Sequence, residues 1–186
     1  MSALHHSKHS ISVEEYLAGE QHSELRHEYI DGQVYAMTGA SRPHGLIASA
    51  LVYALTPSVR RKGCQLFMAD MKLRLEIGGK TVFYYPDLLL TCDPQDRELY
   101  FCSAPCLIVE ILSESTARVD RREKLLAYQT LPSLQTYVLL EQDAMRAEVY
   151  QRAANWQVEY VEQGAIRIDC LDMDLPLADV YADVQV

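Results

Sequence analysis

The sequence predicts an α/β (α+β) fold, a mixed β-sheet flanked by a few helices. Short runs rich in β-branched and aromatic residues, such as KLRLEI and TVFYY, follow one another after Cys64. The run CLIVEIL is apolar on both sides of its plane, which is typical of a central strand that is covered above and below. A helical segment separates this run from TYVLLE, which indicates a βαβ unit.

The first third of the chain predicts a helix, a hairpin and a longer helix. Ser12–Glu15 has the form of a capping box, which indicates a short helix through Tyr16 and Leu17. HEYIDGQVYAM is a pair of alternating runs joined by Asp31 and Gly32, typical of a hairpin with a type I′ turn. Ser41 and Pro43 start the next helix, and Pro57 ends or restarts it near Arg60. Its apolar positions are Leu46, Ile47, Ala50, Leu51 and Leu55.

The rest of the chain reads mostly as strands. Those expected are CQLFMA, KLRLEI, TVFYY, PDLLLTC, CLIVEIL and TYVLLE, with a turn at Gly78 and Gly79. After CLIVEIL, Ser115 or Thr116 can cap a helix that runs to about Leu131. RAEVYQR, NWQVEYVEQ and AIRIDCL then predict an antiparallel meander with a closing turn at Leu175 and Pro176.

The chain of 186 residues can bury one sizeable core, and no linker-like stretch divides it. We therefore expect a single domain over residues 11–186 after a flexible tail at residues 1–10. His5, His6 and His9 could trap a metal ion, but a polar tail explains them more simply. No apolar run approaches the roughly 20 residues of a membrane span, so we expect no membrane partner and a cytoplasmic protein.

Five cysteines without a CxxC pair favour reduced thiols over a disulfide framework or a structural zinc site. Cys102 and Cys106 could bind a metal ion, although small apolar residues at a turn and a strand start explain them better. The formal net charge of -9 counts against a protein that coats nucleic acid non-specifically, but it does not exclude an enzyme that acts on nucleic acid.

Two carboxylates interrupt apolar runs. Glu110 lies within CLIVEIL and Asp87 precedes LLL. An ionised carboxylate out of water needs a cation, a metal ion or a raised pKa. If the two strands are neighbours, the carboxylates converge at one end of the sheet, where Mg²⁺ suits such a pair.

The helix after CLIVEIL offers a third group. Asp120, Lys124 and Tyr128 are spaced i, i+4, i+8 on one stripe, at the border of an apolar face made by Leu125 and Leu126. A short connection would bring Lys124 over the carboxylates, where an ammonium can orient or help deprotonate a metal-bound water and stabilise the charge that builds on a pentavalent phosphate. The alternatives are a stabilising ion pair and a solvated helix face.

The segments YPDLLL, APCLIVEILSEST and DRREKLLAYQTLPSLQTYVLLEQD resemble, in this order, the restriction endonuclease family of the Uma type. This family is abundant in cyanobacteria and is a branch of the PD-(D/E)XK nuclease superfamily. The resemblance runs from about Ser12 to about Glu162. It implies a restriction-endonuclease-like core, a mixed sheet with helices on both faces, and hydrolysis of phosphodiesters with a divalent metal ion. Asp87 takes the place of the PD aspartate and Glu110 that of the second acid.

The sequence departs from the superfamily pattern at Leu112, where the motif has a lysine. The resembling family supplies the lysine from the next helix, which here is Lys124. Glu114 replaces a proline that is usual in the family. An additional acid from the N-terminal region is common in the superfamily, and Glu28 is the candidate. The alternative, given equal weight, is that Glu28 is an exposed residue of the hairpin. His44, in HGLIASAL, could lie near the cleft, although a histidine in the first turn of a helix is most often a surface or capping residue.

The function predicted is a Mg²⁺-dependent or Mn²⁺-dependent endonuclease of DNA. Asp87, Glu110 and the Ile111 carbonyl hold the metal ion, and Lys124 assists. Arg118, Arg121 and Arg122, or the cluster of Arg60, Arg61 and Lys62, could contact DNA, and each could equally be a solvated face. The alternative is a catalytically inactive nuclease fold that serves as a binding or interaction module. A homodimer is expected because a two-fold dimer is the commonest oligomer.

Overall fold

The computed structural model describes residues 10–37, 39–114 and 116–185. The helical elements are α1 (Val13–Glu20), α2 (Arg42–Lys62), α3 (Ala117–Val119), the π-helical turn η1 (Asp120–Lys124), α4 (Leu125–Gln129), the 3₁₀ turns η2 (Arg152–Ala154) and η3 (Asp169–Leu171), and α5 (Leu177–Val180). The predicted tail falls on residues 1–10, of which residues 1–9, with His5, His6 and His9, lie outside the described residues.

The strands form three sheets. They are β1 (His27–Ile30), β2 (Gln33–Ala36), β3 (Gln65–Met68), β4 (Lys72–Ile77), β5 (Lys80–Tyr84), β6 (Leu88–Thr91), β7 (Phe101–Cys102), β8 (Leu107–Ile111), β9 (Thr136–Leu140), β10 (Ala147–Gln151), β11 (Val158–Val161), β12 (Ala165–Ile168) and β13 (Met173–Pro176). A central six-stranded sheet has the order β11-β10-β9-β8-β6-β3, a five-stranded sheet has the order β2-β1-β5-β4-β7, and β12 pairs with β13.

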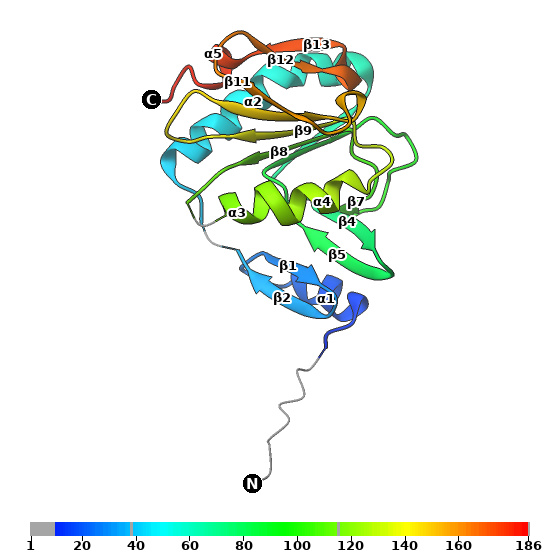
Figure 1. Cartoon of the computed structure of the whole chain (residues 1–186). Helices are drawn as coiled ribbons and strands as arrows, with labels where there is room; N and C mark the ends of the chain where they lie inside the picture. Colours follow the sequence, from blue (N-terminus) through cyan, green and yellow to red (C-terminus); the bar gives the residue numbers. More distant parts are fainter. Residues whose placement is uncertain (1–9, 38, 115, 186) are drawn as a thin grey trace.

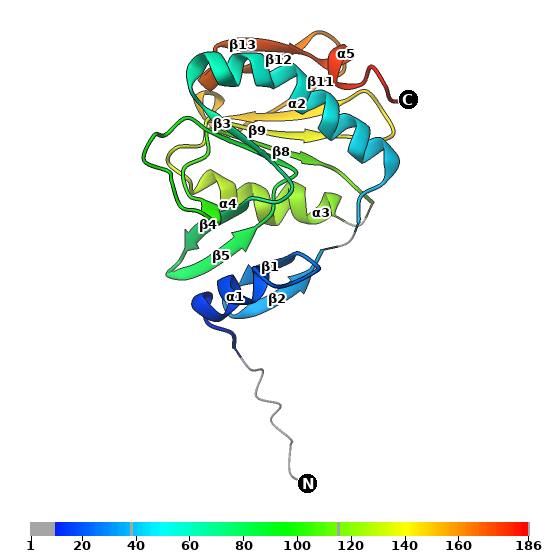
Figure 2. The same cartoon turned by 180° about the vertical axis from the view of Figure 1, so that it is seen from behind.

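The central sheet is mixed, as predicted, because β8 and β9 run parallel while its other neighbours run antiparallel. α2 covers one face of this sheet, with β12 and β13 beyond it, and α3 and α4 lie between the other face and β4–β5 (Figures 1 and 2). Alternate residues of β8 therefore enter two different cores. Val109 packs with α2, and Ile108 packs with α4 and β4.

The local signals of the first third are confirmed. Ser12 and Glu15 form both hydrogen bonds of a capping box at the start of α1. Ile30 pairs with Gln33 across the hairpin, and the two turn residues, Asp31 and Gly32, have φ of 48° and 86°. Positive φ at both positions is the type I′ geometry.

Pro57 does not end α2, contrary to the prediction. The helix continues through it to Lys62 and ends at Gly63, which has φ of 69°. A proline removes one helical hydrogen bond, but Leu55 and Val59 on either side of Pro57 are both buried against the central sheet. Continued burial of this apolar face explains why the helix passes through the proline.

The predicted meander is only partly correct. β10 and β11 extend the central sheet as expected, but β12 leaves it and pairs with β13. Leu175 and Pro176 lie within β13 rather than in a turn. The cause is the outer face of α2, since Ile166, Ile168 and Leu175 are buried in the same core as that helix.

The prediction of five reduced thiols is wrong for two cysteines. Cys64 and Cys92 form a disulfide, with Cα atoms 4.2 Å apart. Cys64 directly precedes β3 and Cys92 directly follows β6, and the antiparallel pair Gln65–Thr91 places the two cysteines side by side. The two cysteines are 28 residues apart in the sequence, and only the register of β3 against β6 brings them together. Among the described residues, no helix is long and apolar enough to cross a membrane.

Candidate active site

Asp87 and Glu110 meet at one end of the central sheet. β6 and β8 run antiparallel with Leu88 opposite Val109, so Asp87 comes opposite Glu110. The Asp87 N–H donates to Glu110 Oε2 at 3.3 Å, and the Ile111 N–H donates to Asp87 Oδ2 at 2.7 Å. The convergence of the two acids that the sequence predicts is therefore present in the structure.

Glu110 is buried, with 3% of its surface exposed. Its Oε1 accepts hydrogen bonds from Lys124 Nζ at 3.0 Å and from the Tyr128 hydroxyl at 2.8 Å. Burial raises the pKa of Glu110 to about 8; Lys124 and Tyr128 oppose this rise, while Asp87 and Asp120 add to it. The site thus holds a carboxyl group whose charge is costly without a cation.

Lys124 is the central cation of the site. Besides Glu110, its Nζ lies 3.3 Å from Glu28 Oε1 and 3.2 Å from Asp120 Oδ1, and 5.5 Å from the centre of the Tyr84 ring. Burial lowers the pKa of Lys124, but Glu110, Glu28 and Asp120 raise it more, so that it ends well above its ordinary value. Lys124 is therefore a protonated ammonium held among the carboxyl groups of Glu110, Glu28 and Asp120.

The helix that carries Lys124 contains a π-helical turn at Asp120–Lys124. Asp120, Lys124 and Tyr128 are all buried, so the alternative of a solvated face is wrong. The expected apolar face is also wrong in part, because Leu126 is 67% exposed while Leu125 packs against the core. A π turn has one extra residue and rotates the side chains that follow it, which explains why α-helical spacing misplaced Leu126.

His44 contacts Asp87 directly. Its Nε2 lies 3.0 Å from Asp87 Oδ1, and its side chain is 16% exposed. It stands in the first turn of α2, where Ser41 caps the helix by accepting from the His44 N–H. His44 is thus a neighbour of the first acid, not only the surface or capping residue that its position suggests.

Glu28 reaches the site from a different sheet. It lies in β1 of the five-stranded sheet, and its side chain is 19% exposed beside Lys124. Of the two alternatives left open by the sequence, the exposed hairpin residue is excluded. The role of Glu28 as an additional acid of the active site stays a prediction.

The described residues of the site carry more negative than positive charge. The carboxyl groups of Glu28, Glu110 and Asp120 surround the ammonium of Lys124. A fourth acid, Asp87, adjoins Glu110. Asp120 Oδ1 is buried and, although 3.2 Å from Lys124, receives no well-oriented hydrogen bond within the described part of the chain. An excess of buried acid is the chemical setting that favours a bound cation.

The basic residues next to the site differ in their surroundings. Arg121 is held by Glu141 at 2.8 Å and Glu148 at 2.7 Å. Arg118 and Arg122 are exposed. Contact of these three with DNA stays a prediction, as it does for Arg60, Arg61 and Lys62, which occupy the last turn of α2.

Two residues of the site were not anticipated. Tyr84 places its ring beside Lys124, and Gln142 donates to the Leu112 carbonyl at 2.8 Å and also contacts Ser41. Gln142 thereby links the end of β8 to the start of α2. Tyr84 stands three positions before Asp87 in YYPD, and this closeness in sequence is the only feature that could indicate a place in the site. No sequence feature distinguishes Gln142.

Comparison with known proteins decides the family. Residues 13–177 match the model of the Uma2 family, described as "Putative restriction endonuclease". The chain belongs to this family. It is 36% identical over 143 residues to the Synechocystis sp. protein named "Uncharacterized protein slr1290". This alignment covers 76% of this chain and 74% of that protein. It is 31% identical over 150 residues to "Uncharacterized protein sll1609" of the same organism, covering 79% of this chain and 84% of that protein.

A solved structure has the same fold. It is the crystal structure of "a putative nuclease belonging to DUF820" from Anabaena variabilis, with a TM-score of 0.68, 17% sequence identity, and coverage of 86% of this chain and 92% of that chain. The similarity confirms the nuclease fold expected for a Uma2 family member. The Uma2 core of this chain is the mixed sheet with flanking helices described above.

Proposed function

We propose that this Uma2 family protein is a divalent-metal-dependent endonuclease that hydrolyses phosphodiester bonds of DNA. One observation carries the proposal: Asp87, directly before β6, donates its N–H to Glu110 of β8 at 3.3 Å, and Lys124 from the following helix lies 3.0 Å from Glu110. Two acids and a lysine are the groups that the family resemblance assigns to this chemistry. Here Leu112 occupies the position at which the superfamily motif has its lysine, and Lys124 of η1 supplies the lysine instead.

The residues present fit Mg²⁺ or Mn²⁺. Both ions prefer oxygen ligands, and Mg²⁺ binds through one or two carboxylates while keeping several waters. Asp87 and Glu110 supply the carboxylates. The Ile111 N–H points at Asp87, and the carbonyl of a strand residue lies on the same edge as its N–H, so the Ile111 carbonyl is the third ligand in this proposal.

A divalent ion held by Asp87 and Glu110 would supply Lewis-acid chemistry and would make water a better nucleophile. The protein's own groups do the rest. The Lys124 ammonium stabilises negative charge that builds on the phosphate oxygens, and Glu28, Asp120 and Tyr84 hold this ammonium in place. His44 fixes the orientation of Asp87, and Tyr128 fixes that of Glu110.

The proposed substrate is DNA, and the exposed Arg118 and Arg122 next to the site are suited to contact its phosphates. A homodimer that addresses two strands also stays a prediction. Size-exclusion chromatography with light scattering tests it, and a mass near 21.1 kDa would contradict it.

The proposal is tested by incubating the purified chain with supercoiled plasmid and Mg²⁺ or Mn²⁺, with and without EDTA. We expect nicking that EDTA abolishes and that Glu110→Ala and Lys124→Ala each lower at least 100-fold, while Glu159→Ala, an exposed glutamate of β11, leaves it unchanged. Nicking that persists in both site variants would refute the assignment. Complete inactivity of the wild-type chain would favour the alternative, an inactive nuclease fold that serves as a binding module.

A further inference from the structure

Four of the five cysteines gather at one end of the central sheet. Cys64 precedes β3, Cys92 follows β6 and Cys106 precedes β8, while Cys170 lies in η3 between β12 and β13. Four separate segments thus bring one cysteine each to the same place. Cys102, the fifth, lies in β7 and packs in the core on the other face of the central sheet.

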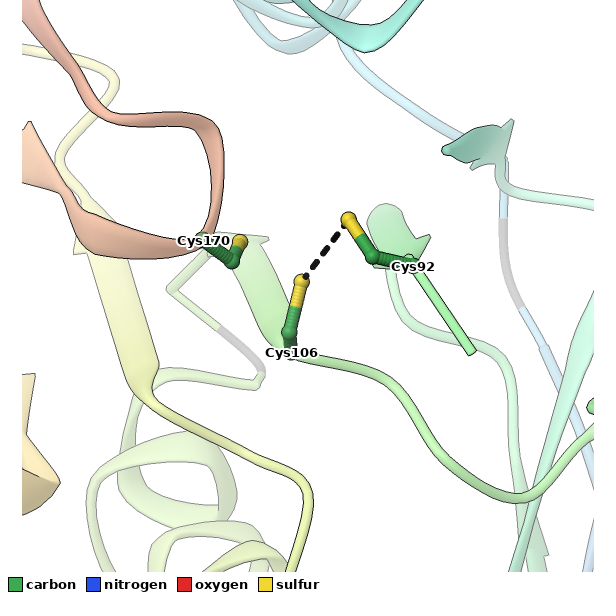
Figure 3. Close-up of side chains that lie close together, drawn as sticks. All are labelled: Cys92, Cys106 and Cys170. Atoms are coloured by element: carbon green, nitrogen blue, oxygen red, sulfur yellow. Dashed lines mark hydrogen bonds between the residues drawn. The ribbon is translucent and has the colours of Figure 1, made fainter. Parts of the chain in front are cut away.

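The sulfur atoms are close enough to share one ion. The Sγ atoms of Cys92, Cys106 and Cys170 all lie within 4.8 Å of one another, and Cys106 Sγ is 3.7 Å from Cys92 Sγ. Figure 3 shows Cys92 and Cys106 pointing toward each other, with Cys170 approaching from the loop beside them. Cys64 Sγ is bonded to Cys92 Sγ and is therefore at most one S–S bond farther away.

This spacing matches a tetrahedral thiolate site. Zinc bound by cysteine has Zn–S distances of about 2.3 Å, which places the sulfur atoms of a tetrahedron about 3.8 Å apart. The distance of 3.7 Å between Cys92 Sγ and Cys106 Sγ is close to this value.

The cysteine group is separate from the candidate active site. β6 begins next to Asp87 and ends next to Cys92, and β8 begins next to Cys106 and ends beyond Glu110. At about 3.3 Å per strand residue, the two sites are more than about 10 Å apart. A metal ion at the cysteines therefore differs from the one proposed for Asp87 and Glu110 in both place and ligand chemistry.

We propose that the reduced chain binds one thiophilic divalent cation, Zn²⁺ by preference, through the thiolates of Cys64, Cys92, Cys106 and Cys170. A dithiol reductant first opens the Cys64–Cys92 disulfide, yielding two protein thiols and the disulfide of the reductant. The four thiols then release four protons as the ion binds. The disulfide and the metal-bound form are thus two alternative states of one site.

The reductant has a route to the disulfide. Cys92 is half-buried and lines a surface cavity of about 430 Å³ together with Gly63, Gln65 and Thr91. Disulfide exchange requires that the attacking sulfur reach one of the bonded sulfurs. The cavity therefore offers access to Cys92, whereas Cys106 is buried.

The expected consequence of the metal is structural. Cys170 belongs to the segment that joins β12 and β13, whereas the other three cysteines belong to the central sheet. A shared ion would tie the two-stranded sheet to the central sheet, so zinc should stabilise the folded chain. Its loss should loosen residues 165–176 first.

Cobalt titration tests the proposal. The full chain, reduced by a phosphine that is oxidised to its oxide, is titrated with Co²⁺ under nitrogen, and absorption is recorded in the visible and near-ultraviolet. We expect intense tetrahedral bands and a thiolate-to-cobalt charge-transfer band that saturate at one ion per chain and disappear on addition of one Zn²⁺. Carboxylate and imidazole ligands give no thiolate band, so binding elsewhere is distinguished.

Variants locate the site. Cys106→Ser and Cys170→Ser should each lower Co²⁺ affinity at least 100-fold, while the matched control Cys102→Ser should bind as the wild type does. Circular dichroism verifies that each variant folds, and Cys170→Ser, at a half-buried position, serves if Cys106→Ser does not fold. Absence of the thiolate band in the reduced, folded wild type, or an equal loss in Cys102→Ser, would overturn the proposal.

Discussion

Lys124 Nζ lies 3.0 Å from Glu110 Oε1, and the two side chains are only 8% and 4% exposed. Such a pair is held together by the low dielectric around it, yet each charge was costly to bury. The pair also receives Glu28 and Asp120, so Lys124 neutralises more acid than a single salt bridge requires. The predictions below follow from this excess of acid around one lysine.

Removal of the lysine should destabilise the protein. Lys124→Ala leaves Glu110 buried without its cation, and breaking a buried pair costs about 3–5 kcal/mol in the free energy of unfolding. Urea unfolding measures this loss. The matched control is Lys80→Ala, whose exposed pair with Asp31 contributes about 1 kcal/mol or less. Equal effects of the two substitutions would show that the buried pair is not special.

The stability of the metal-free protein should fall as the pH rises from about 4.5 to about 8. Burial raises the pKa of Glu110 from 4.5 to about 8, so in this window the folded state binds a proton that the unfolded state has lost. The contribution is fully present below the lower value, and its slope is at most about 1.4 kcal/mol per pH unit. Urea unfolding in EDTA at several pH values measures it.

Glu110→Gln is the control for that experiment, because it keeps the shape but cannot ionise. Its curve should be flatter than that of the wild type between these pH values. Parallel curves for the two proteins would contradict the assignment of the pH dependence to Glu110.

His44 should act on metal binding through Asp87. Without the contact at 3.0 Å, the Asp87 carboxylate is held only by the hydrogen bond from the Ile111 N–H, and we expect Mn²⁺ affinity to fall about tenfold in His44→Ala. Calorimetry measures the affinity, with Asp87→Ala as the variant that should abolish binding. His44→Gln, which can still donate a hydrogen bond, should restore part of it. His22→Ala changes an exposed histidine and should have no effect; a loss there equal to that in His44→Ala would refute a specific role.

The three arginines near the site should separate into two classes. Arg118→Ala and Arg122→Ala remove exposed charges, so each should weaken DNA binding and reduce the dependence of log affinity on log salt by about one unit. Arg121→Ala should mainly lower stability, because it leaves the buried Glu148 without its cation. Fluorescence anisotropy with Ca²⁺ in place of Mg²⁺ measures binding. A salt slope unchanged in both exposed variants would exclude phosphate contacts by these residues.

Much of the site could be predicted because its signals are local. A carboxylate inside or directly beside an apolar run is unusual wherever the strand lies, and this signal identifies Asp87 and Glu110. Lys124 followed from helical spacing together with the family resemblance. The convergence of Asp87 and Glu110 then needed only that β6 and β8 be neighbours, as the structure shows.

The remaining features depend on tertiary structure. Proline lacks an N–H whatever its context, but the burial of Leu55 and Val59 keeps α2 intact around Pro57. The disulfide depends on the register of β3 and β6, which the spacing of cysteines does not reveal. The π turn at Asp120–Lys124 changes which residues face the core, and α-helical periodicity cannot represent it.

The central claim is that Asp87 and Glu110 share one divalent ion beside Lys124. The most direct measurement is a crystal structure of the wild type soaked in Mn²⁺, with data collected to record anomalous scattering from manganese. We expect one anomalous peak within about 2.5 Å of an oxygen of each carboxylate. No peak at that position, with Lys124 still paired to Glu110 and manganese bound elsewhere, would contradict the account.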